Sequence, residues 1–73
     1  MPKICELRFS EEILWEKILA FSQSIEQAEV KPIEKRKVLY LKFPVGTKQN
    51  EVSLRKIYEE AGFKPTIVRC MLL

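Results

Sequence analysis

Two cysteines, Cys5 and Cys70, carry the most reactive side chains of this 73-residue chain. A thiolate can act as a nucleophile or bind a soft metal ion. The chain has no histidine, and all ten of its acidic residues are glutamates. It therefore lacks the usual general base near neutral pH and the commonest zinc ligand besides cysteine. We expect no enzymatic activity and no cofactor, and only Cys5 and Cys70 are candidates for metal or thiol chemistry.

A second group with possible chemistry is the basic stretch KRKVLYLKF, residues 35–43. Residues 31–48 hold six cations and one glutamate, whereas residues 1–30 hold three cations and six glutamates. This local excess of positive charge is typical of a solvated hairpin or of a surface for an anionic partner. Tyr40 lies within the stretch and offers an aromatic ring on which a nucleic-acid base could stack.

The elements that position these residues follow from hydrophobic periodicity and from the helix and strand stop signals. Ser10 is the expected N-cap of the first helix, and Gly62 the expected left-handed residue after the second. We expect a strand at 3–9, a helix from 10 to about 26, a short edge strand around Pro32, a strand at 37–43, a helix from about 47–50 to 61 and a strand at 66–73.

This β-α-β-β-α-β order predicts an α+β, ferredoxin-like sandwich, in which two helices cover one face of a four-stranded antiparallel sheet. The chain is short enough to form one domain, residues 1–73. Alternation assigns the sheet's share of the core to Leu7, Phe9, Leu39, Leu41, Phe43, Val68 and Leu72. Cys5 and Cys70 have the same parity, and two cysteines are too few for a secreted disulfide framework. We therefore expect both to be unpaired, buried packing residues.

One stretch of the chain, KFPVGTKQNEVSLRKIYEEAGFKPTIV at residues 42–68, resembles the second half of heavy-metal-associated domains of the copper-chaperone type. The stretch EVKPIEKRKVLYLKF is similar to the central hairpin of that family, so the resemblance spans residues 28–70. It implies the sheet order 4-1-3-2, with Cys5 and Cys70 on neighbouring strands. The family binds metal through a C-x-x-C loop between first strand and first helix. Here that junction reads RFSEEIL, without a cysteine, so the metal site is not implied.

The face of the sheet that the helices leave open is the expected interaction surface. Its apolar content exceeds that of a solvated sheet face, which favours a protein partner or a second copy of the chain, as in a homodimer. The residues expected to bind this partner are Ile4, Arg8, Val38, Tyr40, Lys42, Ile67, Arg69 and Met71, and Glu6 lies on the same face.

The alternative for this face is single-stranded RNA or another nucleic acid. RKVLYLKF matches the third-strand motif of RNA-recognition domains at Arg36, Tyr40 and Phe43, and departs from it at Lys37, Val38 and Leu39. The residues that would bind nucleic acid are Tyr40, Arg8, Lys35, Arg36, Lys37, Lys42 and Arg69.

The expected location is cytoplasmic, without a membrane contact. No segment approaches the roughly 20 consecutive apolar residues of a membrane span. The first residues, MPKICELRF, lack the apolar block of a signal peptide.

Overall fold

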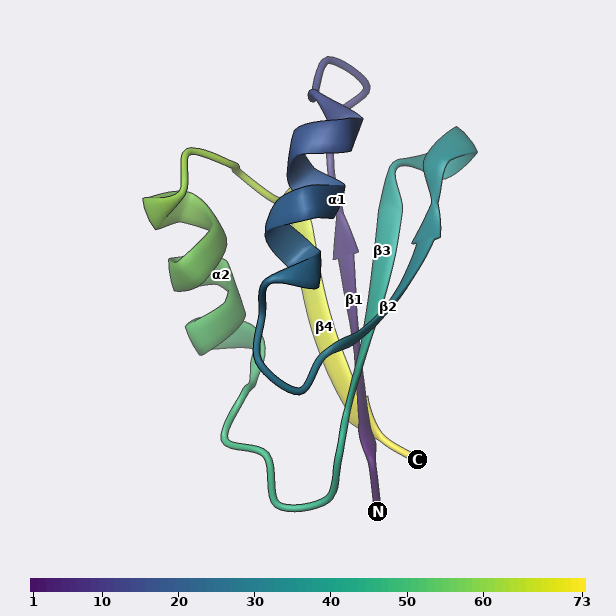
Figure 1. Ribbon diagram of the computed structural model, residues 1–73, viewed down its shortest axis with the longest axis vertical. Helices are drawn as coiled ribbons and strands as arrows, with labels where there is room; N and C mark the ends of the chain where they lie inside the picture. The colour runs from purple at the N-terminus through teal and green to yellow at the C-terminus, as the bar shows by residue number, and fades with distance from the viewer.

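The computed structural model describes residues 1–73 and has the expected β-α-β-β-α-β order. Its elements are β1 (Lys3–Arg8), α1 (Trp15–Gln23), β2 (Glu29–Ile33), a 3-10 turn (Glu34–Arg36), β3 (Val38–Phe43), α2 (Glu51–Glu60) and β4 (Ile67–Leu72). The strands form one antiparallel sheet in the order β2-β3-β1-β4 (Figure 1). The α+β class, the four-stranded antiparallel sheet and the strand order, with the first and third strands central, are therefore confirmed.

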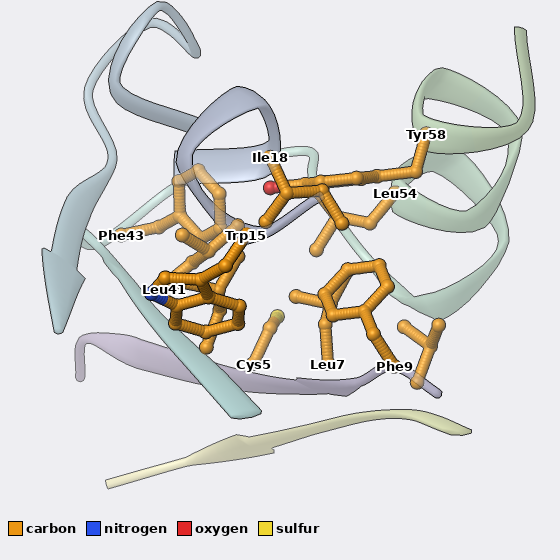
Figure 2. Close-up of a cluster of buried hydrophobic side chains, with 11 residues drawn as sticks. Cys5, Leu7, Phe9, Trp15, Ile18, Leu41, Phe43, Leu54 and Tyr58 are labelled. Carbon is orange, nitrogen blue, oxygen red and sulfur yellow. The ribbon is translucent and has the colours of Figure 1, made fainter. Parts of the chain in front are cut away.

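The core lies between the sheet and the two helices, which cover the same face (Figure 2). Leu7, Leu39 and Leu41 from the central strands are fully buried, and α1 and α2 contribute Ile18 and Leu54. These are large aliphatic side chains, each of which stabilises the fold by about 2 kcal/mol when it leaves water. The sheet-side core is thus as predicted, with one exception at Leu72.

Leu72 is 65% exposed, although alternation placed it in the core. It pairs with Lys3 at the end of the sheet. α2 crosses the sheet nearer the start of β4 (Figure 1), so no helix covers Leu72. The side of the sheet was predicted correctly, but a strand can extend beyond the elements that bury it.

The first helix begins later than expected, at Trp15 rather than next to Ser10. Residues 10–13 form turns, and Leu14 is the N-cap, without a side-chain hydrogen bond to the helix. Leu14 is therefore 62% exposed, while Trp15 takes the buried position. The prediction of Ser10 as the cap was wrong.

The second helix is capped at both ends, and Gly62 is the left-handed residue that was expected after it. The Asn50 side chain accepts from the backbone N–H of Ser53, and the Ser53 hydroxyl accepts from the N–H of Asn50. At the other end Gly62 has φ +91°, and the N–H of Phe63 donates to the carbonyl of Tyr58 over 2.9 Å. The N–H of Gly62 donates to Glu59, which completes a Schellman motif. These local signals fix the direction in which the chain enters β4.

Candidate functional site

The open face of the sheet, defined as the face turned away from the helices, presents three rows of side chains across the four strands. The strand register fixes which residues share a row. In the order β2-β3-β1-β4, the rows are Ile33, Val38, Arg8 and Ile67; then Lys31, Tyr40, Glu6 and Arg69; then Glu29, Lys42, Ile4 and Met71. All eight residues predicted to bind a partner therefore lie on this one face, and β2 adds Glu29, Lys31 and Ile33.

Glu6 is the electrostatic centre of the open face. Its Oε2 atom accepts a hydrogen bond from Nε of Arg8 over 2.5 Å, and its Oε1 atom lies 4.0 Å from Nη2 of Arg69. The hydrogen bond to Glu6 raises the pKa of Arg8 above its usual value. The Glu6 carboxylate thus lies next to two guanidinium groups, that of Arg8 in the first row and that of Arg69 in the second, and the three side chains form one charge cluster.

The apolar side chains of the open face differ in exposure. Val38 is only 4% exposed, although it lies outside the helix-covered core, so its neighbours on the face already cover it. This corrects the expectation that Val38 is free to meet a partner. Met71, by contrast, is 65% exposed, and Ile4, Tyr40 and Ile67 are half-buried. The most exposed apolar side chain of the face is therefore Met71, and Ile33, in the row of Val38, is 40% exposed.

A shallow hollow of about 190 Å³ lies on this face, beside Met71. Ile4 and Met71 form its apolar side, and Glu6, Tyr40 and Arg69 contribute polar groups. Three larger hollows, of about 500, 540 and 440 Å³, lie along the outer side of α2, between the loop after α1 and the loop before α2, and at the end of β3 beside Pro2. Each of those has a single hydrophobic lining residue, whereas the hollow on the sheet combines apolar and charged groups in a smaller space.

The basic turn between β2 and β3 does not join the open face as one surface. The ammonium group of Lys37 lies 5.4 Å from the centre of the Trp15 ring, on the helix side of the sheet. Lys37 also has φ +54°, the left-handed conformation that ends the 3-10 turn. Lys35 and Arg36 are exposed in the 3-10 turn. The structure therefore separates Lys37 from Tyr40, its expected partner in a nucleic-acid site.

The two cysteines are joined in a disulfide bond, which corrects the expectation of unpaired packing residues. They are direct cross-strand partners on β1 and β4, and their Cα atoms are 4.0 Å apart. A disulfide has no thiolate, so in this state neither sulfur is available as a metal ligand. The signal that could have found the bond was the shared parity of the two cysteines on neighbouring strands.

Comparison of the chain with protein-family models, curated proteins and solved structures gave no match. Neither α1 nor α2 has the length and apolar content that a membrane-spanning helix needs. The functional inference therefore depends on the geometry of the open face.

Proposed function

We propose that this chain is a small non-enzymatic binding module that associates through the open face of its sheet, with a second copy of the chain as its first partner. We also propose that its fold is the ferredoxin-like sandwich and that it resembles a heavy-metal-associated domain without the metal loop. The observation that carries the proposal is the hollow beside Ile4 and Met71, next to the Glu6 carboxylate, which is already paired within the chain with Arg8 and Arg69. We place the protein in the cytoplasm.

The cluster around Glu6 makes the open face suited to contact with a protein. Burying an unpaired charge is costly, but Glu6 already has Arg8 and Arg69 as partners within its own chain. A protein surface can therefore cover this part of the face without leaving the Glu6 carboxylate unpaired. A nucleic-acid phosphate would instead compete with Glu6 for the two guanidinium groups.

The sheet edges are less suited to association than the face. The N–H of Phe9 donates to the Lys37 carbonyl, and from there successive residues of β3 point their backbone groups alternately toward β1 and toward β2. In the same register, the nitrogen of Pro32 faces the free edge of β2, where it has no hydrogen to donate. On the free edge of β4, the N–H of Cys70 donates to the Glu51 carboxylate over 3.2 Å. Hydrogen bonds from the N–H groups of Glu51 and Cys70 lower the pKa of Glu51. Both edges are thus partly closed to strand addition.

The size of the face predicts how strong the association is. Four strands about 4.8 Å apart, with about 3.3 Å per residue, give a planar area of roughly 400 Å². A specific interface of standard size buries about 800 Å² on each partner. The open face alone is therefore at the small end, and we expect a reversible dimer with a Kd in the micromolar range or above.

Sedimentation tests this proposal over a concentration range from about 10 µM to about 1 mM. The wild-type chain should show a rising average mass. Met71→Glu should stay monomeric because it places a carboxylate in the apolar part of the face. Val52→Glu is the matched control: Val52 is 78% exposed on α2, away from the sheet, so this variant should behave as the wild type.

A wild-type chain that stays monomeric throughout would remove self-association, and association unchanged by Met71→Glu would move the interface away from this face. The same samples can be titrated with a labelled single-stranded oligonucleotide at ~50 mM salt. Binding that weakens in Tyr40→Ala and with added salt would favour the nucleic-acid alternative instead.

A further inference from the structure

The disulfide joins β4, an edge strand, to β1, and the two halves of β4 differ in the side-chain contacts that hold them. At the start of β4, the N–H of Thr66 donates to the Arg8 carbonyl over 2.7 Å, and Arg55 donates to the Pro65 carbonyl over 3.1 Å. Val68, which follows, is buried. The first half of β4 is therefore held by side chains as well as by backbone pairing with β1.

Besides the disulfide, the second half of β4 has two side-chain contacts: the Glu51 carboxylate accepts from the Cys70 N–H over 3.2 Å, and Glu6 lies 4.0 Å from Arg69. Met71 and Leu72 are both 65% exposed, and β4 has no strand on its outer side. Beyond Val68, the only side chain of β4 that packs against the core is Cys70, which is bonded to the fully buried Cys5. Cys5 lies among the core side chains below the helices (Figure 2). The sulfur bridge is thus the main side-chain tether of this half-strand.

We propose that the Cys5–Cys70 bond is a redox-controlled latch on the second half of β4, closed in the disulfide and opened by a dithiol reductant. This inference rests on the tethering of β4 alone and does not depend on the proposed function. A cytoplasmic setting would make the latch relevant, because cellular dithiols keep most thiols there reduced.

The exchange reaction has a defined direction. Cys70 lies on the edge strand and is partly exposed, whereas Cys5 is fully buried. A thiolate of the dithiol attacks Sγ of Cys70, the S–S bond breaks, and Cys5 leaves with the electron pair and takes up a proton. The second thiolate of the reductant then attacks its own mixed-disulfide sulfur and releases Cys70, which is protonated in turn. Two electrons pass from the dithiol, which becomes a disulfide, to the two cysteines.

This exchange should be slow while β4 is paired with β1, because the leaving group is the buried Cys5. A Cys5 thiolate would form in an apolar core, where charge is disfavoured. Reduction should therefore accelerate under conditions that loosen β4, such as low concentrations of denaturant. Once reduced, the second half of β4 retains its backbone bonds to β1 but loses its covalent tether.

Amide hydrogen exchange of the oxidised and the dithiothreitol-reduced protein tests the latch. Intact mass first shows whether the purified protein lacks two hydrogens, as the disulfide requires. On reduction, the amides of Arg69 and Met71 should exchange about tenfold faster relative to those of β2, the other edge strand. β2 is the internal control, because a general loss of stability would accelerate both edge strands equally. Equal acceleration, or a protein with two free thiols after air oxidation, would overturn the proposal.

Two further measurements sharpen the test. Cys70→Val retains an apolar side chain without the sulfur, so its β4 amides should exchange rapidly with or without dithiothreitol; exchange as slow as in the oxidised wild type would contradict the latch. If this variant does not fold, the reduced wild type supplies the same comparison. Brief alkylation of the reduced protein should modify Cys70 before Cys5, and the reverse order would contradict the proposed point of attack.

Discussion

At the scale of single residues, the feature least visible in the sequence is a buried hydroxyl pair between the helices. Ser22 of α1 and Tyr58 of α2 are both fully buried, and their hydroxyl groups are hydrogen-bonded to each other. The Ser22 hydroxyl donates to the Ile18 carbonyl over 2.8 Å, so the proton in the pair comes from Tyr58. The pair fixes how the two helices pack against each other.

Removing the Ser22 hydroxyl alone should cost more than removing both hydroxyl groups. Ser22→Ala leaves the Tyr58 hydroxyl buried without a partner and should lower the free energy of unfolding by about 1–3 kcal/mol. Tyr58→Phe leaves Ser22 bonded to Ile18 and should cost about 1 kcal/mol. Urea unfolding of both variants and of the double variant measures the coupling. A double variant less stable than Ser22→Ala alone would show that the hydroxyl pair has no such role.

The same tyrosine should make stability sensitive to alkaline pH. Burial raises the pKa of Tyr58 from 10.0 to about 12. Between these values the unfolded chain loses the phenolic proton while the folded chain retains it. The free energy of unfolding therefore falls as pH rises from 10 to 12, by up to about 2–3 kcal/mol. The test is the difference from Tyr58→Phe: a parallel decline in the two proteins would contradict the assignment.

The burial of a residue could be predicted from the sequence when the alternation of its strand or the 3.6-residue period of its helix alone decided which side it faces. Leu39, Leu41 and Phe43 were assigned correctly because the alternation along β3 alone places each of them on the side of the sheet that the helices cover. Ser22 was missed because a hydroxyl in an amphipathic helix is usually on the polar side. Val38 is on the predicted face but is covered by its neighbours, and alternation contains no information on that.

At the scale of elements, the two helices contrast in their N-terminal caps. α2 begins at a capping box, whereas the N-cap of α1 is Leu14, with no side-chain hydrogen bond. The start of α2 was predictable to within a few residues because Asn50 is a strong local signal. The start of α1 was not, since Ser10 is an equally good signal that the chain uses in a turn instead.

This contrast predicts that α1 can be stabilised at its first turn. Leu14→Asp supplies an acceptor for the unbonded N–H groups and a negative charge at the positive end of the helix. Because Leu14 is 62% exposed, little packing is lost. The free energy of unfolding should rise by about 1 kcal/mol, whereas Asn50→Ala in α2 should lower it by a similar amount. Thermal unfolding followed by circular dichroism checks both, and a loss of stability in Leu14→Asp would show that Leu14 has a packing role.

At the scale of the whole molecule, the order of the elements predicted the layers and the family resemblance implied the strand order, whereas the disulfide was not predicted. The order of elements and their apolar faces leave few ways to cover one sheet with two helices. The pairing of Cys5 with Cys70 depends on the register of β1 with β4, which no local pattern sets. The partner of the open face depends on another surface, so the sequence placed these residues on one face, while their binding role and their ligand remain proposals.

A core of this size makes the disulfide important for overall stability. Only 14 of 73 residues are buried, and a chain this short has a small net stability. The bond joins cysteines 65 residues apart, so it restricts much of the unfolded chain. By the loop-entropy estimate, reduction should lower the free energy of unfolding by about 4 kcal/mol. Urea unfolding with and without dithiothreitol measures this difference, and Cys70→Val, in which no bond can form, should give one midpoint under both conditions. Wild-type midpoints that coincide in the two buffers would mean that the bond constrains the second half of β4 without supporting the whole fold.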